Sequence, residues 1–481
     1  MKKRLCSLLL CLAVLLTLLP AAALASDDAV QTPPREDATY GASIWVSGIE
    51  LFPGQHLANY TNTPGQKEPT TPGYANMMTG RDCFGTGVVG LSQKNIVDGV
   101  PVLAEILRDL GYTSTCIGFQ GNAAGRGYDK YISFPGWGPD HDDGRAHKAQ
   151  SLNDVAIPEL ERLAAQDQPF MLFLRHMDPH SPYLPPVPFQ DMFFQGDAFD
   201  PEDKRMQKVY DFKPFGDYIK SWVPDGCTNP DYVIAQYDAA VAYMDNCIQQ
   251  ILTKLEALGL EEDTVVIFTS DHGETLYDHD CYFDHHSIYD CVLNVPFMFK
   301  YPKFGYEGHV SDITQIKDVL PTILSLCGID AGIKFDGRDM TKAITGEGVE
   351  QESEFYITEA TWMRKHGWRT PEWKLMVALE PDFHFKPEIE LYNLINDPEE
   401  LHNLADEEPE VVAFLRARME AHIAKREAEV GHANPMYTNL NWSGFGRPFV
   451  SSEEAYNTLH IGDPAAAQKL QSKLKEMGVE E

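Results

Sequence analysis

Short apolar runs alternate with amphipathic segments of helical period along most of this chain. The apolar runs have the length and the β-branched content of buried strands. The predicted strands cover residues 43–49, 115–118, 170–174 and 264–269, and the predicted helices cover residues 102–110, 152–165 and 232–258. This alternation is typical of βαβ units, so the sequence predicts an α/β fold with a large, mostly parallel sheet flanked by helices.

The pattern changes after Gly337 and Arg338. Shorter apolar runs at residues 355–361, 374–378 and 391–392 predict a smaller sheet, and residues 408–427 predict a charged helix. We therefore expect a main domain over residues 26–345 and a smaller C-terminal α/β subdomain with a tail over residues 346–481. The proline-rich and polar stretch at 182–225 is expected to be a long surface excursion.

The first 25 residues have the pattern of a secretory signal peptide. Three basic residues at positions 2–4 precede an apolar run at 8–19, and Ala23-Leu24-Ala25 offers small residues for cleavage. A membrane anchor needs about 20 apolar residues, so no stable anchor is expected. The prediction is an exported protein that is periplasmic, attached to the cell surface or secreted.

Composition narrows the set of partners. The formal net charge is −33, with 72 acidic against 39 basic residues. Such a charge excludes nucleic acid and anionic membrane surfaces as expected partners, and an anionic small substrate would need a local metal or an Arg/Lys pocket. Of the nine cysteines, those beyond the predicted signal are odd in number and form no C-x-x-C pair, so their pairing stays open and structural zinc is not expected.

The stretch Ser270-Asp271-His272-Gly273-Glu274 directly follows the predicted strand 264–269. Parallel strands present ligands at their carboxyl ends. A carboxylate beside an imidazole, followed by a glycine, suits a divalent cation there. The alternative is that Asp271 caps a following helix. The five residues alone leave both interpretations open.

Several segments taken in order resemble the sulfatase family of the alkaline phosphatase superfamily. They are residues 110–115, 169–173, 177–183, 270–274, 283–290, 295–297, 318–322, 326–329, 373–375 and 390–399. The resemblance spans roughly residues 42 to 425. It implies an alkaline-phosphatase-like sandwich and a metal-dependent hydrolase of sulfate, or phosphate, esters from secreted or glycan-derived sources.

The resemblance also implies roles for individual residues. Asp271 and His272 match the family's metal-binding pair, which implies one divalent cation, with calcium first and magnesium, manganese or zinc as alternatives. His180 matches a histidine that contacts the sulfate and assists departure of the alcohol; the alternative is a turn hydrogen bond. His285 falls at a lysine position and could bind sulfate when protonated. His286 is a further substrate-binding candidate, and the alternative for both is a polar loop without chemistry.

The N-terminal half departs from the family pattern. The family carries a Cys-x-Pro-x-Arg motif whose cysteine becomes the nucleophile. In this chain the matching stretch has Thr70 at the position of that cysteine and Tyr74 at the position of the arginine. Threonine has no route to formylglycine, so none is expected. Only Glu50 keeps a carboxylate at the first-strand metal position. The family's Gly-Lys-Trp-His signature is not present at the matching position, residues 118–121. Asn122, which follows that position, is a further substrate-binding candidate.

Three interpretations follow. The chain is a working hydrolase that uses Thr70 directly, in the manner of the phosphodiesterase branch of the superfamily. Alternatively, it is a catalytically weak or inactive sulfatase relative that serves as a binding protein. The third interpretation is that the N-terminal stretch reflects a faulty gene model or a deletion.

Overall fold

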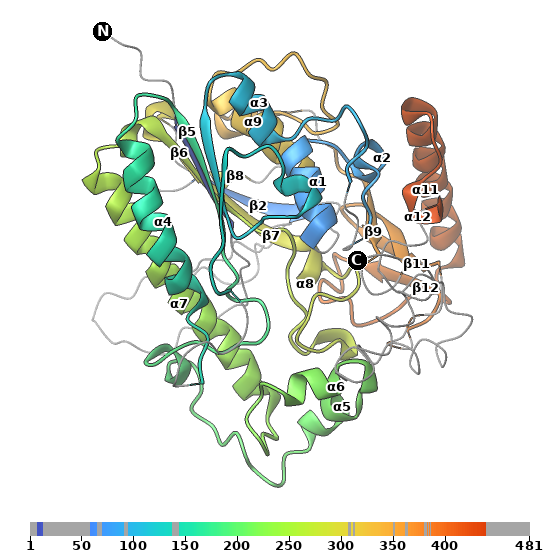
Figure 1. Ribbon diagram of the computed structural model, residues 1–481. Helices are drawn as coiled ribbons and strands as arrows, with labels where there is room; N and C mark the ends of the chain where they lie inside the picture. The colour runs from blue at the N-terminus through green and yellow to red at the C-terminus, as the bar shows by residue number, and fades with distance from the viewer. Residues whose placement is uncertain are drawn as a thin grey trace, which may run out of the picture.

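The computed structural model of the chain describes residues 7–12, 58–64, 70–90, 95–136, 144–305, 309–310, 313–349, 352–360, 364–379, 382, 384 and 386–438. The described strands form one large sheet and one small sheet (Figure 1). The order in the large sheet is β4-β3-β5-β1-β6-β7-β2-β8. Its strands are β1 (Ser7–Leu12), β2 (Ala58–Pro64), β3 (Thr113–Ile117), β4 (Lys130–Ile132), β5 (Phe170–Arg175), β6 (Thr264–Thr269), β7 (Asn294–Lys300) and β8 (His309–Val310).

The predicted parallel character of the large sheet is confirmed. Strand β1 pairs in parallel with both β5 and β6, and β3 pairs in parallel with β4 and β5. Only β7 runs antiparallel to its neighbours β6 and β2. The carboxyl ends of β5 and β6 therefore lie at the same edge of the sheet, where ligands and catalytic groups gather in such folds.

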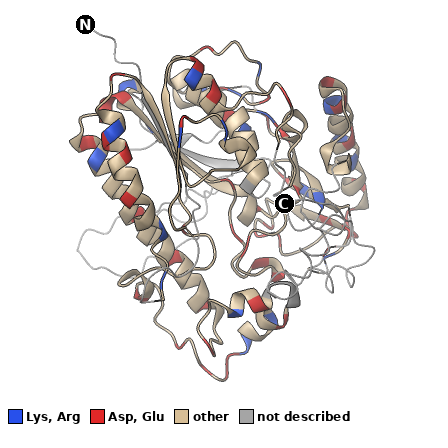
Figure 2. Ribbon diagram, viewed as in Figure 1, with Lys and Arg blue, Asp and Glu red and all other residues tan. Residues whose placement is uncertain are grey.

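Helices cover both faces of this sheet because successive strand residues point to opposite sides. On one face, Leu172 and Val266 pack under α4 (Lys148–Ala164) and α7 (Pro230–Ala257). On the other, Met171 and Val265 pack under α1 (Thr70–Thr79), α3 (Leu103–Asp109) and α9 (Val319–Leu326). Charged residues of both signs lie along α4, whereas those of α7 are mostly acidic (Figure 2). Within the described part of the chain, no helix is both long and apolar enough to span a membrane.

The small sheet has the antiparallel order β12-β11-β10-β9. Its strands are β9 (Phe355–Glu359), β10 (Lys365–Arg369), β11 (Trp373–Ala378) and β12 (Ile389–Asn393), and α11 (Pro409–Val430) packs on it. Sequence reasoning missed β10, because its residues Lys365-His366-Gly367-Trp368-Arg369 carry no apolar run. The predicted domain border near residue 345 stays a prediction.

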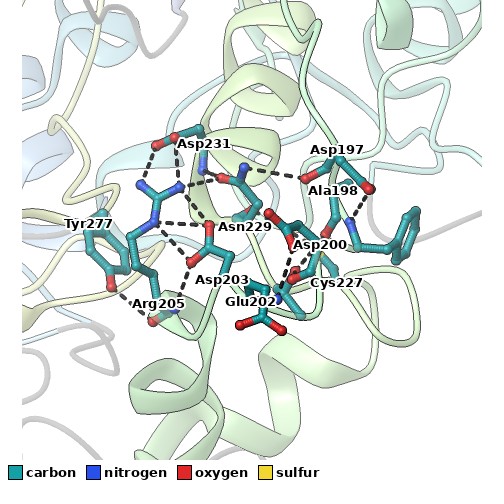
Figure 3. Close-up of polar contacts among 12 residues, drawn as sticks. Asp197, Ala198, Asp200, Glu202, Asp203, Arg205, Cys227, Asn229, Asp231 and Tyr277 are labelled. Atoms are coloured by element: carbon teal, nitrogen blue, oxygen red, sulfur yellow. Dashed lines mark hydrogen bonds and ion pairs between the residues drawn. The ribbon is translucent and has the colours of Figure 1, made fainter.

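The predicted surface excursion contains two helices, α5 (Arg205–Asp211) and α6 (Lys213–Lys220). Arg205 joins this segment to the start of α7 (Figure 3). Its guanidinium lies 2.8 Å from Asp203 and 2.9 Å from Asp231, and it donates to Asn229 at 2.9 Å. Asn229 is itself the N-cap of α7. The excursion is thus fixed to a long core helix.

The central strand β1 was not predicted. It lies within the apolar run that the sequence predicts to be part of a signal peptide, yet Leu8–Leu12 pair with Met171–Arg175 on one side and Val265–Thr269 on the other. Residues 7–12 cannot both be removed with a signal peptide and form the central strand of the mature protein. The predicted strand at 43–49 and the predicted metal ligand Glu50 lie outside the described residues.

Removing residues 1–25 distinguishes these fates. A chain that starts at Ser26 would leave β5 and β6 without the strand between them, and unpaired backbone groups inside a sheet promote aggregation. We expect that chain to be insoluble, or to melt well below the full chain in circular dichroism. A chain that lacks only residues 2–5 keeps β1 and serves as the control. Equal melting temperatures for the Ser26 chain and the full chain would contradict the strand and support signal removal.

Candidate active site

The site is built on the tight turn that follows β6. Gly273 donates its backbone N–H to the carbonyl of Val292 at 2.8 Å. A Cβ at this position would collide with the carbonyl oxygen of Cys291, so only glycine permits the approach. The turn leaves Asp271 and His272 at the carboxyl edge of the sheet, and both are buried. Asp271 caps no helix in the described chain, so the helix-cap alternative is wrong.

The loop after this turn returns to the same place. Thr275 and Asp284 exchange backbone hydrogen bonds of 2.8 and 3.3 Å. This bridge brings the ring of His285 onto that of His272, with centroids 4.0 Å apart and planes 23° apart. Non-glycine residues with positive φ flank the loop's histidines, Phe283 at 54° and Ser287 at 70°. Such strained backbone is concentrated at functional sites in proteins.

His180 joins this pair from the loop after β5. Its ring centroid lies 5.4 Å from that of His285 and 6.3 Å from that of His272. The buried ammonium of Lys148 donates to the carbonyls of His180 at 2.7 Å and Pro182 at 3.0 Å. It also lies 3.7 Å from the buried carboxylate of Asp178. Lys148 therefore positions the loop that carries His180.

Burial and close charges determine the protonation of the cluster. Burial lowers the pKa of His180 to about 3, and the neighbouring His285 charge adds to this effect, so His180 is neutral. Burial also disfavours the charged form of His285, but the Asp284 carboxylate outweighs it and raises the His285 pKa to about 9. Burial raises the pKa of Glu274 to about 8. The Asp284 pKa is lowered despite burial, because His285 and His286 face it.

A second group of residues lies near Asp271. Arg175 ends β5, and its guanidinium lies 5.9 Å from the ring centroid of Tyr74 and 5.6 Å from that of Phe119. Burial raises the Asp271 pKa, and the charge of Arg175 is the first effect that opposes this rise. Burial likewise raises the Tyr74 pKa, which keeps its hydroxyl protonated. Tyr74, the residue predicted at the family's arginine position, thus lies beside a true arginine.

The remaining predicted residues are distributed as follows. Thr70 is the first residue of α1, but its side chain is not among those described, so its role as nucleophile stays a prediction. The next residue, Thr71, is buried and accepts a 3.0 Å hydrogen bond from Asn122. His286 packs against His384, with centroids 4.7 Å apart, and so faces the small subdomain. The substrate-binding roles of Asn122 and His286 stay predictions.

Sequence reasoning missed four residues of this cluster: Lys148, Arg175, Glu274 and Asp284. Glu274 and Asp284 lie close in sequence to His272 and His285, inside the motifs at 270–274 and 283–290. This closeness was the signal in the sequence that could have identified them. Lys148 and Arg175 carry no motif. Each is a cation beside a buried carboxylate, which only the folded chain reveals.

Comparison with known proteins identifies the family. The family model "Sulfatase" matches residues 50–329, more than half of the chain. The chain belongs to the sulfatase family. A second model, "N-sulphoglucosamine sulphohydrolase, C-terminal", matches residues 278–428.

The relatives agree with this assignment. Arylsulfatase K of Bos taurus is 29% identical over 300 residues, which cover 56% of this chain and 54% of that protein. The chain thus spans about half the length of this curated relative. A structure solved in complex with D-glucosamine-2-N,6-O-disulfate has a TM-score of 0.64 at 17% identity and covers 90% of this chain and 100% of its own. The phosphonate monoester hydrolase of Agrobacterium radiobacter has a TM-score of 0.62 at 18% identity, and the match covers 88% of this chain and 96% of that one. These structures confirm the predicted alkaline-phosphatase-like fold.

Members of the sulfatase family generally use a divalent metal. Among the described residues, His272, Glu274 and His285 form the one group of this kind that could hold an ion. Two imidazoles and one carboxylate do not reproduce the six to eight oxygen ligands that calcium takes. The predicted calcium site of Asp271, His272 and Glu50 stays a prediction, because Glu50 lies outside the described residues.

Replacing Lys148 by methionine tests its positioning role. The change would leave the Asp178 carboxylate buried without its cation and free two carbonyls, which should cost about 3–5 kcal/mol of unfolding free energy. Chemical denaturation measures this loss. The matched control is Lys208→Met, because Lys208 and its ion-pair partner Asp280 are 47% and 61% exposed, and exposed pairs contribute about 1 kcal/mol or less. Equal losses in the two variants would contradict the role of Lys148.

Proposed function

We propose that the protein is a metal-dependent hydrolase of the sulfatase family that cleaves sulfate or phosphate esters, with Thr70 as the nucleophile. The observation that supports this proposal is the convergence of His180, Asp271, His285 and Arg175 at one carboxyl edge of the sheet. Buried titratable groups with strongly shifted pKa values are typical of catalytic sites. The membership of the family supports the reaction class.

Arg175 supplies a positive charge that the sequence motif lacks. Tyr74 stands where the family motif has arginine, and Arg175 lies against its ring. Its Nη1 donates to the sulfur of Met177, a weak acceptor, at 2.8 Å. Among the described residues, its Nε has no hydrogen-bond partner. A guanidinium with unmet donors at a strand edge suits the oxygens of a sulfuryl or phosphoryl group.

His180 is suited to move the proton of the reaction. Its Nδ1 lies 2.8 Å from the carbonyl oxygen of Ser181, so a neutral ring donates there and presents Nε2 as an acceptor. In the proposed step the Thr70 oxygen bonds to phosphorus or sulfur while the ester bond to the alcohol breaks. The Thr70 proton passes to His180 and then to the departing alkoxide. Water then hydrolyses the threonine ester and restores the hydroxyl.

This chemistry favours phosphate over sulfate esters. A gem-diol nucleophile can expel sulfate by collapsing to an aldehyde, whereas a threonine ester must wait for attack by water. Slow turnover of sulfate esters is therefore part of the proposal. The substrate class proposed is a small-molecule or glycan ester in an exported setting. A relative's structure contains a disulfated glucosamine. The phosphonate monoester hydrolase fold supports the phosphodiesterase-like variant of the same mechanism.

Substituting Thr70 tests the nucleophile. We expect Thr70→Ala to lower kcat by roughly 10⁴- to 10⁶-fold, because it removes the attacking oxygen. Thr70→Ser keeps that oxygen and should retain measurable turnover. The assay uses aryl sulfate, phosphate monoester and phosphodiester substrates in parallel. Undiminished turnover by Thr70→Ala would show that another group attacks, and no turnover on any substrate by the wild-type chain would favour the inactive, binding relative.

Substituting Arg175 tests the replacement of the lost cation. Arg175→Met should lower kcat/KM by about 10²- to 10³-fold, the loss seen when one donor to a transition-state oxyanion is removed. Arg175→Lys keeps the charge and should recover part of it. The control is Arg162→Met, because Arg162 is 44% exposed on α4. A kcat/KM for Arg175→Met equal to that of the control would exclude Arg175 from the site.

A further inference from the structure

His272, Glu274 and His285 come together from two segments of one folded loop. Their ligand atoms all lie within 4.8 Å of one another, and each residue is at most 6% exposed. We propose that these three side chains bind a divalent transition ion of the zinc type. This site differs from the oxygen-rich one predicted from the sequence, and its use in catalysis rests on the proposed hydrolase function.

The surrounding contacts orient each ring toward the ion. The Nδ1 of His272 lies 2.8 Å from the carbonyl oxygen of Gly273. The Nδ1 of His285 lies 2.8 Å from a carboxylate oxygen of Asp284. Metal-binding histidines typically donate one ring N–H to such an acceptor and bind the ion through the other nitrogen. In His272 this leaves Nε2 as the ligand atom.

Glu274 is oriented in the same way. The hydroxyl of Tyr183, itself 1% exposed, donates to Oε1 of Glu274 at 2.5 Å. Among the described residues, Oε2 has no hydrogen-bond partner, and it lies 3.9 Å from Nδ1 of His285. A buried carboxylate oxygen without a partner is costly unless a cation meets it. Oε2 of Glu274, which accepts no hydrogen bond from a described residue, is therefore placed to meet an ion.

The donor set selects the kind of ion. Calcium and magnesium take oxygen ligands, whereas zinc is commonly held by two imidazoles and one carboxylate, with a position left for water or substrate. Imidazole donors also suit iron and other first-row ions. His285 then binds the ion and not the sulfate, which replaces the role expected from its place in the sequence motif.

The site is measured with the full chain and with Zn²⁺ and Ca²⁺ as probes. After chelation and dialysis, calorimetric titration should show one Zn²⁺ bound per chain, and Zn²⁺ but not Ca²⁺ should raise the melting temperature. Elemental analysis of the purified chain gives an independent reading. Stabilisation by Ca²⁺ alone, or no binding of either ion, would overturn the proposal.

Variants assign the ligands. Glu274→Gln and His285→Asn should each weaken Zn²⁺ binding by about 100-fold or more, since each removes one of three ligands. The control is His279→Asn, because His279 stacks on Tyr289 outside the cluster. Full Zn²⁺ binding in both Glu274→Gln and His285→Asn would overturn the assignment. If Glu274→Gln does not fold, the wild-type titration with both ions still decides.

The same experiments separate this inference from the proposed function. A chain that binds Zn²⁺ but cleaves no ester would keep the metal site and lose the hydrolase. A chain that cleaves esters with Ca²⁺ alone, and binds no Zn²⁺, would keep the hydrolase and lose this site.

Discussion

The contact between the backbone of Gly273 and that of Cys291 and Val292 determines the geometry of the whole site. It forces the chain to turn directly after β6 and ties that turn to α8 (Asp290–Leu293), the short helix just before β7. The segment between the two points must then fold back on itself, and the Thr275–Asp284 bridge sets its register. As a result, His272 and His285 stack although a loop separates them. A side chain at position 273 would remove this arrangement, because the collision is with backbone atoms that cannot move aside.

The site solves a second problem, which is the burial of several ionisable groups together. Asp271, Glu274 and Asp284 are all nearly inaccessible, and an isolated buried carboxylate is strongly unfavourable. Their compensation is divided. Arg175 serves Asp271, His285 serves Asp284, and Tyr183 serves one oxygen of Glu274. Next to these three carboxylates, Lys148 neutralises Asp178 and holds the loop that carries His180. The second carboxylate oxygen of Glu274 receives no hydrogen bond from any described residue.

The sequence predicted the fold in those parts where local pattern and tertiary position agree. Strand β6 was predicted with the bounds that it has, and α3, α4, α7, β5 and β11 within a few residues, because each is a periodic apolar segment. The site pair His180 and His272 followed from motif order. Strand β10 was missed because its side chains are polar, and β1 because an apolar run near a basic N-terminus is typical of a signal peptide. Arg175 and Lys148 could not be predicted, since their partners are distant in sequence.

The strained backbone and the buried ionisable groups at this edge of the sheet cost folding free energy. That cost is relevant to the choice between an enzyme and an inactive binding relative. Phe283 and Ser287 hold left-handed backbone conformations, which cost about 1–3 kcal/mol each. Burying His272 and His285 among three carboxylates adds a further cost that a hydrophobic core of similar volume would avoid. A protein that only presents a surface to a partner gains nothing from such an interior. A hydrolase does gain, because a fixed cation and a neutral imidazole in a dry site act on charge as it develops. The cost is concentrated around His272 and His285, and this concentration supports the proposal that the edge performs chemistry.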